Sequence, residues 1–292
     1  WAAAALLQGK AVLKRRLAQA ARVDIAALPY DADVVGYVQA WRDAGGRTSL
    51  VTAADDTFAQ QISRHLGLFD DAHGSDGIEN LKGPGKAQFL VEAYGDKQFA
   101  YMGDGEADLA VWRHAGRAIT VNASETVRNR AAALVEDAEH LKTHKPTASA
   151  FLNALRPHQW IKNGLVFLPM LAAHQINGAQ LLVSLLAFIA FSLVASAAYV
   201  TNDLLDLSAD RGHPRKRSRP FAAGSIPIAS GTYMILGLLM LGAGIAGLLG
   251  PMFLGVLAGY FGLTTAYSLY LKRRIIVDIC VLTGLYTVRI IA

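Results

Sequence analysis

The stretch SIPIASGTYMILGLLMLGAGIAGLLGPMFLGVLAGYFGLTTAYSLYL, residues 225–271, contains no charged side chain in 47 consecutive positions. One helix needs about 20 predominantly apolar residues to cross the hydrocarbon core of a bilayer. The run is therefore long enough for two membrane-spanning helices, and we expect the break between them near Gly250 and Pro251. Buried helices of a soluble protein do not account for an uncharged run of this length.

Further spans lie on both sides of this run. From Gly164 to Asn202 the only acidic or basic side chain is His174, so we expect a short span around 161–174 and another around 180–202. A fifth span starts near Ile275. The basic residues outside the spans fall on one side if the spans alternate, and they are Arg156, Lys162, Arg211, Arg215, Lys216, Arg217, Arg219, Lys272, Arg273 and Arg274. Because Lys and Arg collect on the cytoplasmic side, the sequence predicts a multi-pass protein of the bacterial plasma membrane with its N-terminal domain in the cytoplasm.

The first half of the chain has a different composition. Residues 1–150 hold 19 Asp and Glu against 17 Lys and Arg, whereas residues 151–292 hold four acids against 11 Lys and Arg. The net charge of +5 therefore comes from the second half. We expect a soluble domain at 1–141, a linker at 142–150 and a transmembrane domain at 151–292.

Strands and helices alternate in the soluble half, which predicts a parallel α/β sheet. The expected strands lie at 48–52, 99–102 and 118–121; the expected helices lie at 5–21, from Pro29 to about 44, at 57–66, 87–94 and 107–115; and residues 122–150 have a polar, helix-forming composition. Cys280 is the only cysteine, which excludes a disulfide within the chain and a CxxC metal site. The start at Trp1 without a signal-peptide pattern, and the end inside an apolar run, lead us to expect a piece of a longer protein.

Three of the four acids of the second half lie in YVTNDLLDLSADRGHPRKRSRPFAAG, residues 199–224. Asp203, Asp206 and Asp210 are three and four residues apart, so a helix would place them on one face. With no neutralising partner adjacent in sequence the carboxylates repel one another, and hard oxygen ligands suit Mg²⁺, which keeps part of its coordination shell for phosphate oxygens. The basic residues that follow offer phosphate contacts. The alternative is a solvated loop whose basic residues set topology and touch anionic lipid.

NDLLDLSAD at 202–210, with HPRKRSRPFAAGSIP after it, resembles the first aspartate-rich motif of the UbiA superfamily of intramembrane prenyltransferases. The resemblance implies an all-α bundle of nine transmembrane helices around a central cavity, with a second aspartate-rich motif outside this chain. It also implies that Asp203, Asp206 and Asp210 bind a donor diphosphate through Mg²⁺, with Asn202 as a fourth catalytic residue.

RPHQWIKN at 156–163 is similar to the segment that opens the first span of decaprenyl-phosphate phosphoribosyltransferases. This similarity implies phosphoribosyl transfer from phosphoribosyl pyrophosphate to a polyprenyl phosphate, with no nucleic-acid partner. The candidate phosphate-binding residues are Lys162, Arg156, Arg215, Lys216, Arg217, Arg219 and Arg289. Two alternatives stay open: prenyl transfer from a polyprenyl diphosphate to an aromatic or other acceptor, and a non-catalytic scaffold that binds lipid phosphates.

LVTAADD at 50–56 and YMGDGEADLAVW at 101–112 resemble motifs two and four of the haloacid dehalogenase superfamily, which implies a Rossmann-like α/β domain. The resemblance implies that Thr52 ends a strand and binds a phosphate oxygen. It also implies that Lys86 in the GPGK loop is the lysine of motif three, with Lys82 as the alternative. Asp104 and Asp108 match the motif-four acids that hold Mg²⁺. The nucleophile motif DxDGT has no match in the chain. Asp31 and Asp33 precede an amphipathic helix, so we expect Asp31 to cap that helix. Phosphatase activity of this domain stays open.

Overall fold

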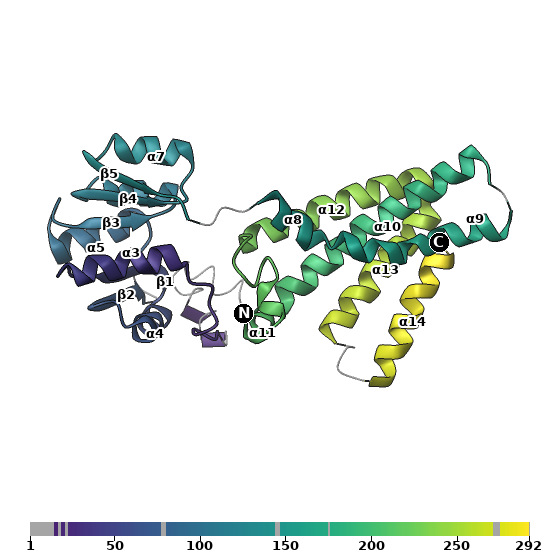
Figure 1. The fold of residues 1–292 in the computed structure, drawn as a ribbon, viewed down its shortest axis with the longest axis horizontal. Coiled ribbons are helices and arrows are strands. Elements are labelled where there is room, and N and C mark those ends of the chain that lie inside the picture. The colour runs from purple at the N-terminus through teal and green to yellow at the C-terminus, as the bar shows by residue number, and fades with distance from the viewer. Residues whose placement is uncertain are drawn as a thin grey trace. The chain divides into compact units, whose positions relative to one another are not determined.

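The computed structural model describes residues 15–16, 19–20, 23–76, 80–143, 147–174, 176–270 and 275–291, without the side chains of 275–278 and Leu282. The chain forms two compact units, Trp1–Lys145 and Pro146–Ala292, drawn as ribbons in Figure 1. Most of the predicted helix at 5–21, residues 144–146 of the predicted linker, and the basic triplet at 272–274 lie outside the described residues.

The strands of the first unit form two parallel sheets. Strand β1 (Ser49–Asp55) pairs with β2 (Asp71–Ser75), and the second sheet has the order β3-β4-β5. Those three strands are β3 (Ala100–Gly103), β4 (Arg117–Val121) and β5 (Asp137–Leu141). The helices around them are α3 (Ala32–Asp43), α4 (Asp56–Leu66), α5 (Pro84–Tyr94), η1 (Glu106–Asp108), α6 (Leu109–Trp112) and α7 (Glu125–Ala132). The predicted alternation into parallel strands is confirmed.

Several boundaries differ from the prediction. Strands β2 and β5 were not expected, because their sequences DAHGS and DAEHL are polar and both are outer strands. Helix α3 begins three residues after Pro29, where Asp31 accepts hydrogen bonds from the N–H groups of Asp33 and Val34, as expected of a cap. Helix α5 begins at Pro84 because proline fits the first helical turn. Strand β1 continues past Thr52 to Asp55.

A polar cluster joins the first residues of β1 and β2. The Asp71 carboxylate accepts hydrogen bonds from Ser49 Oγ, from Tyr94 Oη at 3.0 Å and from Arg47 Nη2 at 3.1 Å. Burial acts to raise the pKa of Asp71, but these hydrogen bonds and nearby His73 outweigh it, so the pKa is lowered. The ionised carboxylate therefore stabilises this sheet.

The second unit is helical. Its elements are α8 (Ala148–Leu155), η2 (Pro157–Phe167), α9 (Leu168–Ala172), α10 (Gly178–Leu205), α11 (Leu207–Gly212), η3 (Lys216–Ser218), α12 (Ile228–Leu249), α13 (Pro251–Leu269) and α14 (Ile275–Ile291). Three of them, α10, α12 and α13, are long and apolar enough to cross a membrane. The break predicted between the middle spans is confirmed, because Gly250 has a φ of +119° and Pro251 opens α13.

The expected first span is not a continuous α-helix. It consists of the 3₁₀ helix η2 followed by the short helix α9. Pro157 and Pro169 lack N–H groups and Gly164 is a poor helix former, which explains why an α-helix does not run through this segment. In Figure 1 the chain passes from α8 to α9 and returns along α10.

The core of the second unit forms where α10 meets α12 and α13. Phe191 is fully buried and packs edge-on against Phe253 and Tyr260, with ring centroids 5.7 and 5.4 Å apart. A Cβ on Gly242 of α12 would lie 2.7 Å from Val194 Cγ2, so glycine permits the close approach of α12 to α10. This packing fixes the position of α10, whose C-terminal end carries the acidic residues.

Candidate active site

The predicted acidic motif lies where α10 passes into α11. Asp206 is the joint: its φ of −90° and ψ of 7° end α10, and α11 starts at the next residue. The three aspartates of the motif therefore do not lie within one helix, because α10 ends at Asp206. Asp203 and Asp210 lie on the two sides of the joint, and both are buried.

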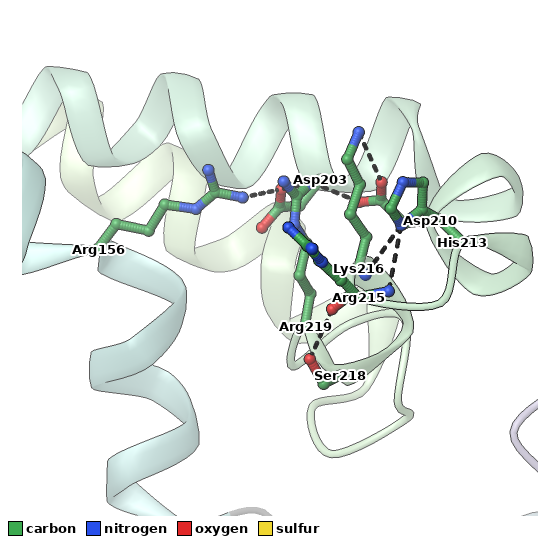
Figure 2. A network of polar contacts seen from close by, with 8 residues as sticks. All are labelled: Arg156, Asp203, Asp210, His213, Arg215, Lys216, Ser218 and Arg219. Carbon is green, nitrogen blue, oxygen red and sulfur yellow. Dashed lines mark hydrogen bonds and ion pairs between the residues drawn. The ribbon is translucent and has the colours of Figure 1, made fainter.

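Basic side chains from two segments, one before α10 and one after α11, converge on these two aspartates (Figure 2). Arg156 Nη2 donates to Asp203 Oδ1 at 2.5 Å, and Arg219 Nη1 donates to the same oxygen at 3.1 Å. Arg219 Nη1 also lies 2.6 Å from Asp210 Oδ2. Lys216 Nζ lies 3.9 Å from Asp210 Oδ1. Two carboxylates thus meet three cations, and the repulsion expected between the aspartates is relieved by partners from before α10 and from the loop after α11.

Arg156 reaches Asp203 from an uncommon backbone conformation. It ends α8 with φ 53° and ψ 57°, in the left-handed region, directly before Pro157. A residue other than glycine costs about 1 kcal/mol or more in this region. Its guanidinium also lies over the Tyr199 ring, 5.2 Å from the centroid. The contacts with Asp203 and Tyr199 offset the backbone cost and fix the side chain at the end of α10.

The fit of a magnesium ion rests on the oxygens of this cluster. Asp210 Oδ1 is buried and accepts no hydrogen bond from the described residues, since Lys216 Nζ is too far for one. Carboxylate oxygens of Asp203, Asp206 and Asp210, with the Asn202 amide oxygen close by in sequence, are the hard ligands that Mg²⁺ prefers. However, the part of the chain that the structure describes contains no group of three or more His, Cys, Asp or Glu side chains placed to hold a metal. The donor types therefore fit Mg²⁺, whereas an assembled ligand set is not present.

The other predicted phosphate contacts are not part of this cluster. Lys162, Arg215 and Arg217 are exposed. Arg289 lies in a separate buried network. His213, which the sequence did not single out, accepts hydrogen bonds at Nδ1 from the N–H groups of Arg215 and Lys216. It thereby shapes the turn that brings Lys216 next to Asp210 (Figure 2).

Comparison with known proteins places the second unit in a family. Residues 164–292 match the family described as UbiA prenyltransferase family. This part of the chain is a UbiA-family domain. The match covers α10, the aspartate cluster and the helices that follow it.

Relatives of the whole chain and of the UbiA-family domain are also known. An uncharacterized protein of Sinorhizobium fredii is 39% identical over 289 residues, 97% of this chain and 55% of that protein. The nodulation protein NoeC of Azorhizobium caulinodans is 39% identical over 142 residues, 49% of this chain and 46% of its own length. The decaprenyl-phosphate phosphoribosyltransferase of Mycobacterium tuberculosis is 38% identical over 163 residues, 53% of each chain. The chain thus spans about half the length of the curated relatives it matches.

The first unit contains a separate polar constellation. Lys86 Nζ donates to Tyr101 Oη at 2.8 Å, and Tyr101 Oη donates to Asp108 Oδ1 at 2.8 Å. The N–H groups of Asp104 and Gly105 donate to Asp108 Oδ2 at 3.1 and 3.0 Å. Burial, followed by the Asp108 carboxylate, raises the pKa of Tyr101 well above its usual value of 10.0, so the phenol keeps its proton and bridges Lys86 and Asp108.

The structure brings some, but not all, of the haloacid dehalogenase-type residues together. Lys86 lies in the first turn of α5 rather than in a loop, and it is buried. Asp104 is exposed, whereas Asp108 is tied to the backbone of the same turn. Thr52 Oγ1 accepts a hydrogen bond from the Ala54 N–H within β1. Tyr101, which links Lys86 to Asp108, was not predicted, because a tyrosine in a strand is indistinguishable from a core residue in sequence.

Proposed function

We propose that this chain belongs to a Mg²⁺-dependent membrane transferase that moves a phosphoribosyl group from phosphoribosyl pyrophosphate to a polyprenyl phosphate. The observation that carries the proposal is the pair of buried aspartates, Asp203 and Asp210, among Arg156, Arg219 and Lys216 at the end of an apolar helix. The UbiA-family match supports a membrane transferase, and the similarity to a decaprenyl-phosphate phosphoribosyltransferase supports the choice of substrates.

The proposed roles follow from charge and position. The guanidinium groups of Arg156 and Arg219 bind oxygens of the donor diphosphate, because arginine presents a planar fork of N–H donors to phosphate. Asp203, Asp206 and Asp210 hold Mg²⁺, which when bound supplies Lewis-acid stabilisation of the departing pyrophosphate. The Tyr199 ring packs against the Arg156 guanidinium and fixes its position. Lys216 adds positive charge where the leaving group collects negative charge.

The position of the cluster suits a substrate that is shared between water and lipid. Asp203 lies two residues before the end of α10, an apolar helix of 28 residues. A soluble sugar phosphate arrives from the aqueous side, whereas the polyprenyl chain stays in the bilayer. We place this end of α10 at the cytoplasmic face of a bacterial plasma membrane, because the exposed basic residues Arg215, Lys216 and Arg217 lie beside it.

The test uses the full-length protein in membranes with Mg²⁺. Incubation with polyprenyl phosphate and labelled phosphoribosyl pyrophosphate is expected to place label in the lipid fraction, and Asp203→Asn is the matched inactive control. A parallel reaction with labelled polyprenyl diphosphate and an aromatic acceptor tests prenyl transfer, which the family description favours. Lipid binding without transfer in either reaction would support the scaffold alternative and refute the enzyme.

For the first unit we propose a phosphate-binding site of the haloacid dehalogenase type, built from Thr52, Lys86, Asp104 and Asp108. Its support is the hydrogen-bonded chain from Lys86 through Tyr101 to Asp108. A strand between β1 and β3, which do not pair with each other in the described residues, would complete one continuous sheet. Phosphatase activity is tested by hydrolysis of a phosphate monoester by the full-length protein, with Asp104→Asn as the variant that should lose it.

A further inference from the structure

A charged side chain lies buried in the core of the UbiA-family domain, away from the aspartate cluster. Arg289 of α14 is 5% exposed. Its Nε donates to Asn163 Oδ1 at 2.8 Å, its Nη1 to the Leu285 carbonyl at 2.5 Å, and its Nη2 to Tyr260 Oη at 2.9 Å. All three acceptors are neutral, and no carboxylate of the described side chains pairs with Arg289.

The neutral partners fix the orientation of the guanidinium. Asn163 is 1% exposed, and its Nδ2 donates to Ser192 Oγ on α10 at 3.1 Å. Because arginine only donates, the Asn163 oxygen must face Arg289 and its NH₂ must face Ser192. The rings of Tyr260 and Tyr286 lie with their centroids 4.9 and 5.6 Å from Arg289 Cζ. Residues of η2, α13 and α14 thus hold the cation directly, and α10 supports it through Asn163.

Two aromatic rings face the cation, but no carboxylate of the described side chains neutralises its charge. Burial of a cation without a counter-charge is costly, and ionisable groups within membrane helices are rare and generally mark functional sites. A guanidinium has five N–H groups. Three have acceptors here, so two are left without one among the described residues. The missing partner is an anion with several oxygens, for which phosphate is the best match.

The location distinguishes a lipid phosphate from a soluble one. Tyr260 and Leu285, which accept hydrogen bonds from Arg289, belong to the apolar cluster that also contains Val166 and Phe191. Ser192 lies eleven residues before Asp203 on α10, about 16 Å along the helix axis. At such a distance from the end of α10, a phosphate attached to an apolar chain is favoured over a soluble one. In a displacement at the ribose carbon the leaving and attacking phosphates lie on opposite sides of that carbon, so two separated cationic groups suit the two substrates.

We propose that Arg289 binds the phosphate of the polyprenyl phosphate, and that Asn163 is the positioning residue that orients Arg289. This proposal rests on the proposed function, since it assigns the acceptor to a site distinct from the donor site at Asp203. Asn163 was not singled out by the sequence, where it is one of several polar residues in RPHQWIKN. Its two hydrogen bonds and its complete burial identify it in the structure.

The test measures lipid binding to the purified full-length protein without donor, so its result does not depend on which group is transferred. Dissociation constants are compared for polyprenyl phosphate, polyprenyl diphosphate and polyprenol of one chain length. Arg289→Gln is expected to raise the dissociation constant of polyprenyl phosphate by at least about 10-fold, because a charged hydrogen bond is lost. The dissociation constant of polyprenol should stay within about twofold of the wild-type value. Thr287→Ala, exposed on the same helix and bonded only to the Thr283 carbonyl, is the control that should change neither.

The Asn163→Asp variant distinguishes an effect on lipid binding from an effect on protein stability. The carboxylate keeps the size of Asn163 and gives Arg289 a permanent partner, so the protein should fold with unchanged or greater stability while polyprenyl phosphate binds about 10-fold more weakly. If either variant prefers polyprenyl phosphate over polyprenol as strongly as the wild type does, the proposal is overturned. Equal loss of both lipids would also overturn it, because Arg289 would then serve packing alone. Weakening of the diphosphate alone would assign the site to a diphosphate donor instead.

Discussion

Replacement of Asp203 by asparagine tests the candidate active site most directly. The change keeps the size of the side chain and removes one negative charge from a position that is 2% exposed. Arg219 keeps its contact with Asp210 at 2.6 Å, so the loss falls mainly on Arg156, whose only described carboxylate partner is Asp203. Hydrogen bonds to charged groups contribute about 1.5–3 kcal/mol, and breaking a fully buried ion pair costs about 3–5 kcal/mol.

The expected loss of stability lies near the lower of these ranges. The side chain of Arg156 is 21% exposed, so water can solvate part of the guanidinium after the substitution. We therefore expect Asp203→Asn to lower the free energy of unfolding by about 2 kcal/mol. The effect on activity should be larger than this loss explains, because in the proposed mechanism the carboxylate also helps to bind the donor through the metal. A fall in rate of at least about 10²-fold, or about 2.7 kcal/mol, is expected for the folded protein.

The assay is the initial rate of the full-length protein in membranes as a function of Mg²⁺ and donor concentration, normalised to the folded fraction. Asp206→Asn should lower the initial rate as well. Arg217→Ala provides a contrast: Arg217 is exposed, so its loss should mainly raise the donor KM, as for a contact made equally in ground and transition states. Near-wild-type rates with an unchanged Mg²⁺ dependence in both aspartate variants would refute the metal-diphosphate assignment and the enzyme with it.

Other predictions concern stability, packing and topology. Because the pKa of Asp71 is lowered in the folded state, its stabilising effect is complete above its unfolded pKa of about 3.9 and is lost as pH falls through the folded value. Asp71→Asn should therefore speed proteolysis of the first unit at pH 7, with the difference from wild type vanishing once the pH falls below the lowered pKa of Asp71. Gly242→Ala places a Cβ 2.7 Å from a neighbouring side chain and should destabilise the second unit by about 1–3 kcal/mol in detergent unfolding, whereas Gly247→Ala, with open space around it, should not. A cysteine at Gly105, in a variant lacking the native cysteine, should react with an impermeant thiol reagent only after cells are opened. Deletion of residues 1–141 should leave lipid transfer intact, and its loss in a folded membrane domain would show that the two units are catalytically coupled.

The sequence was sufficient where a signal is local. The uncharged run at 225–271 predicts two membrane helices and their break, because length and composition decide membrane insertion. The cap at Asp31 and the left-handed Gly67 that ends α4 are local features as well. The first predicted span was only partly correct, since nothing in its hydropathy distinguishes an α-helix from a 3₁₀ helix.

The candidate site depended on contacts that no spacing reveals. Arg156 and Asp203 are 47 residues apart in sequence and meet through one hydrogen bond. Asn163 and Arg289 are 126 residues apart. The sequence singled out the charged members of both pairs because charges are rare in an apolar segment. It could not single out Asn163, Tyr199 or Tyr260, because a neutral polar or aromatic residue in such a segment is ordinary until its partner is known.

The geometry of η2 changes how membrane crossings are counted. A 3₁₀ helix rises about 2 Å per residue, so the 11 residues of η2 and the 5 of α9 extend about 30 Å, roughly the thickness of a hydrocarbon core. A count restricted to long α-helices omits this segment and leaves one crossing, α10, between Arg156 and Asp203. One crossing would put these residues on opposite faces of the bilayer, yet they share a hydrogen bond. The bond therefore requires an even number of crossings between them, which places Arg156 and Asp203 on the same face of the bilayer.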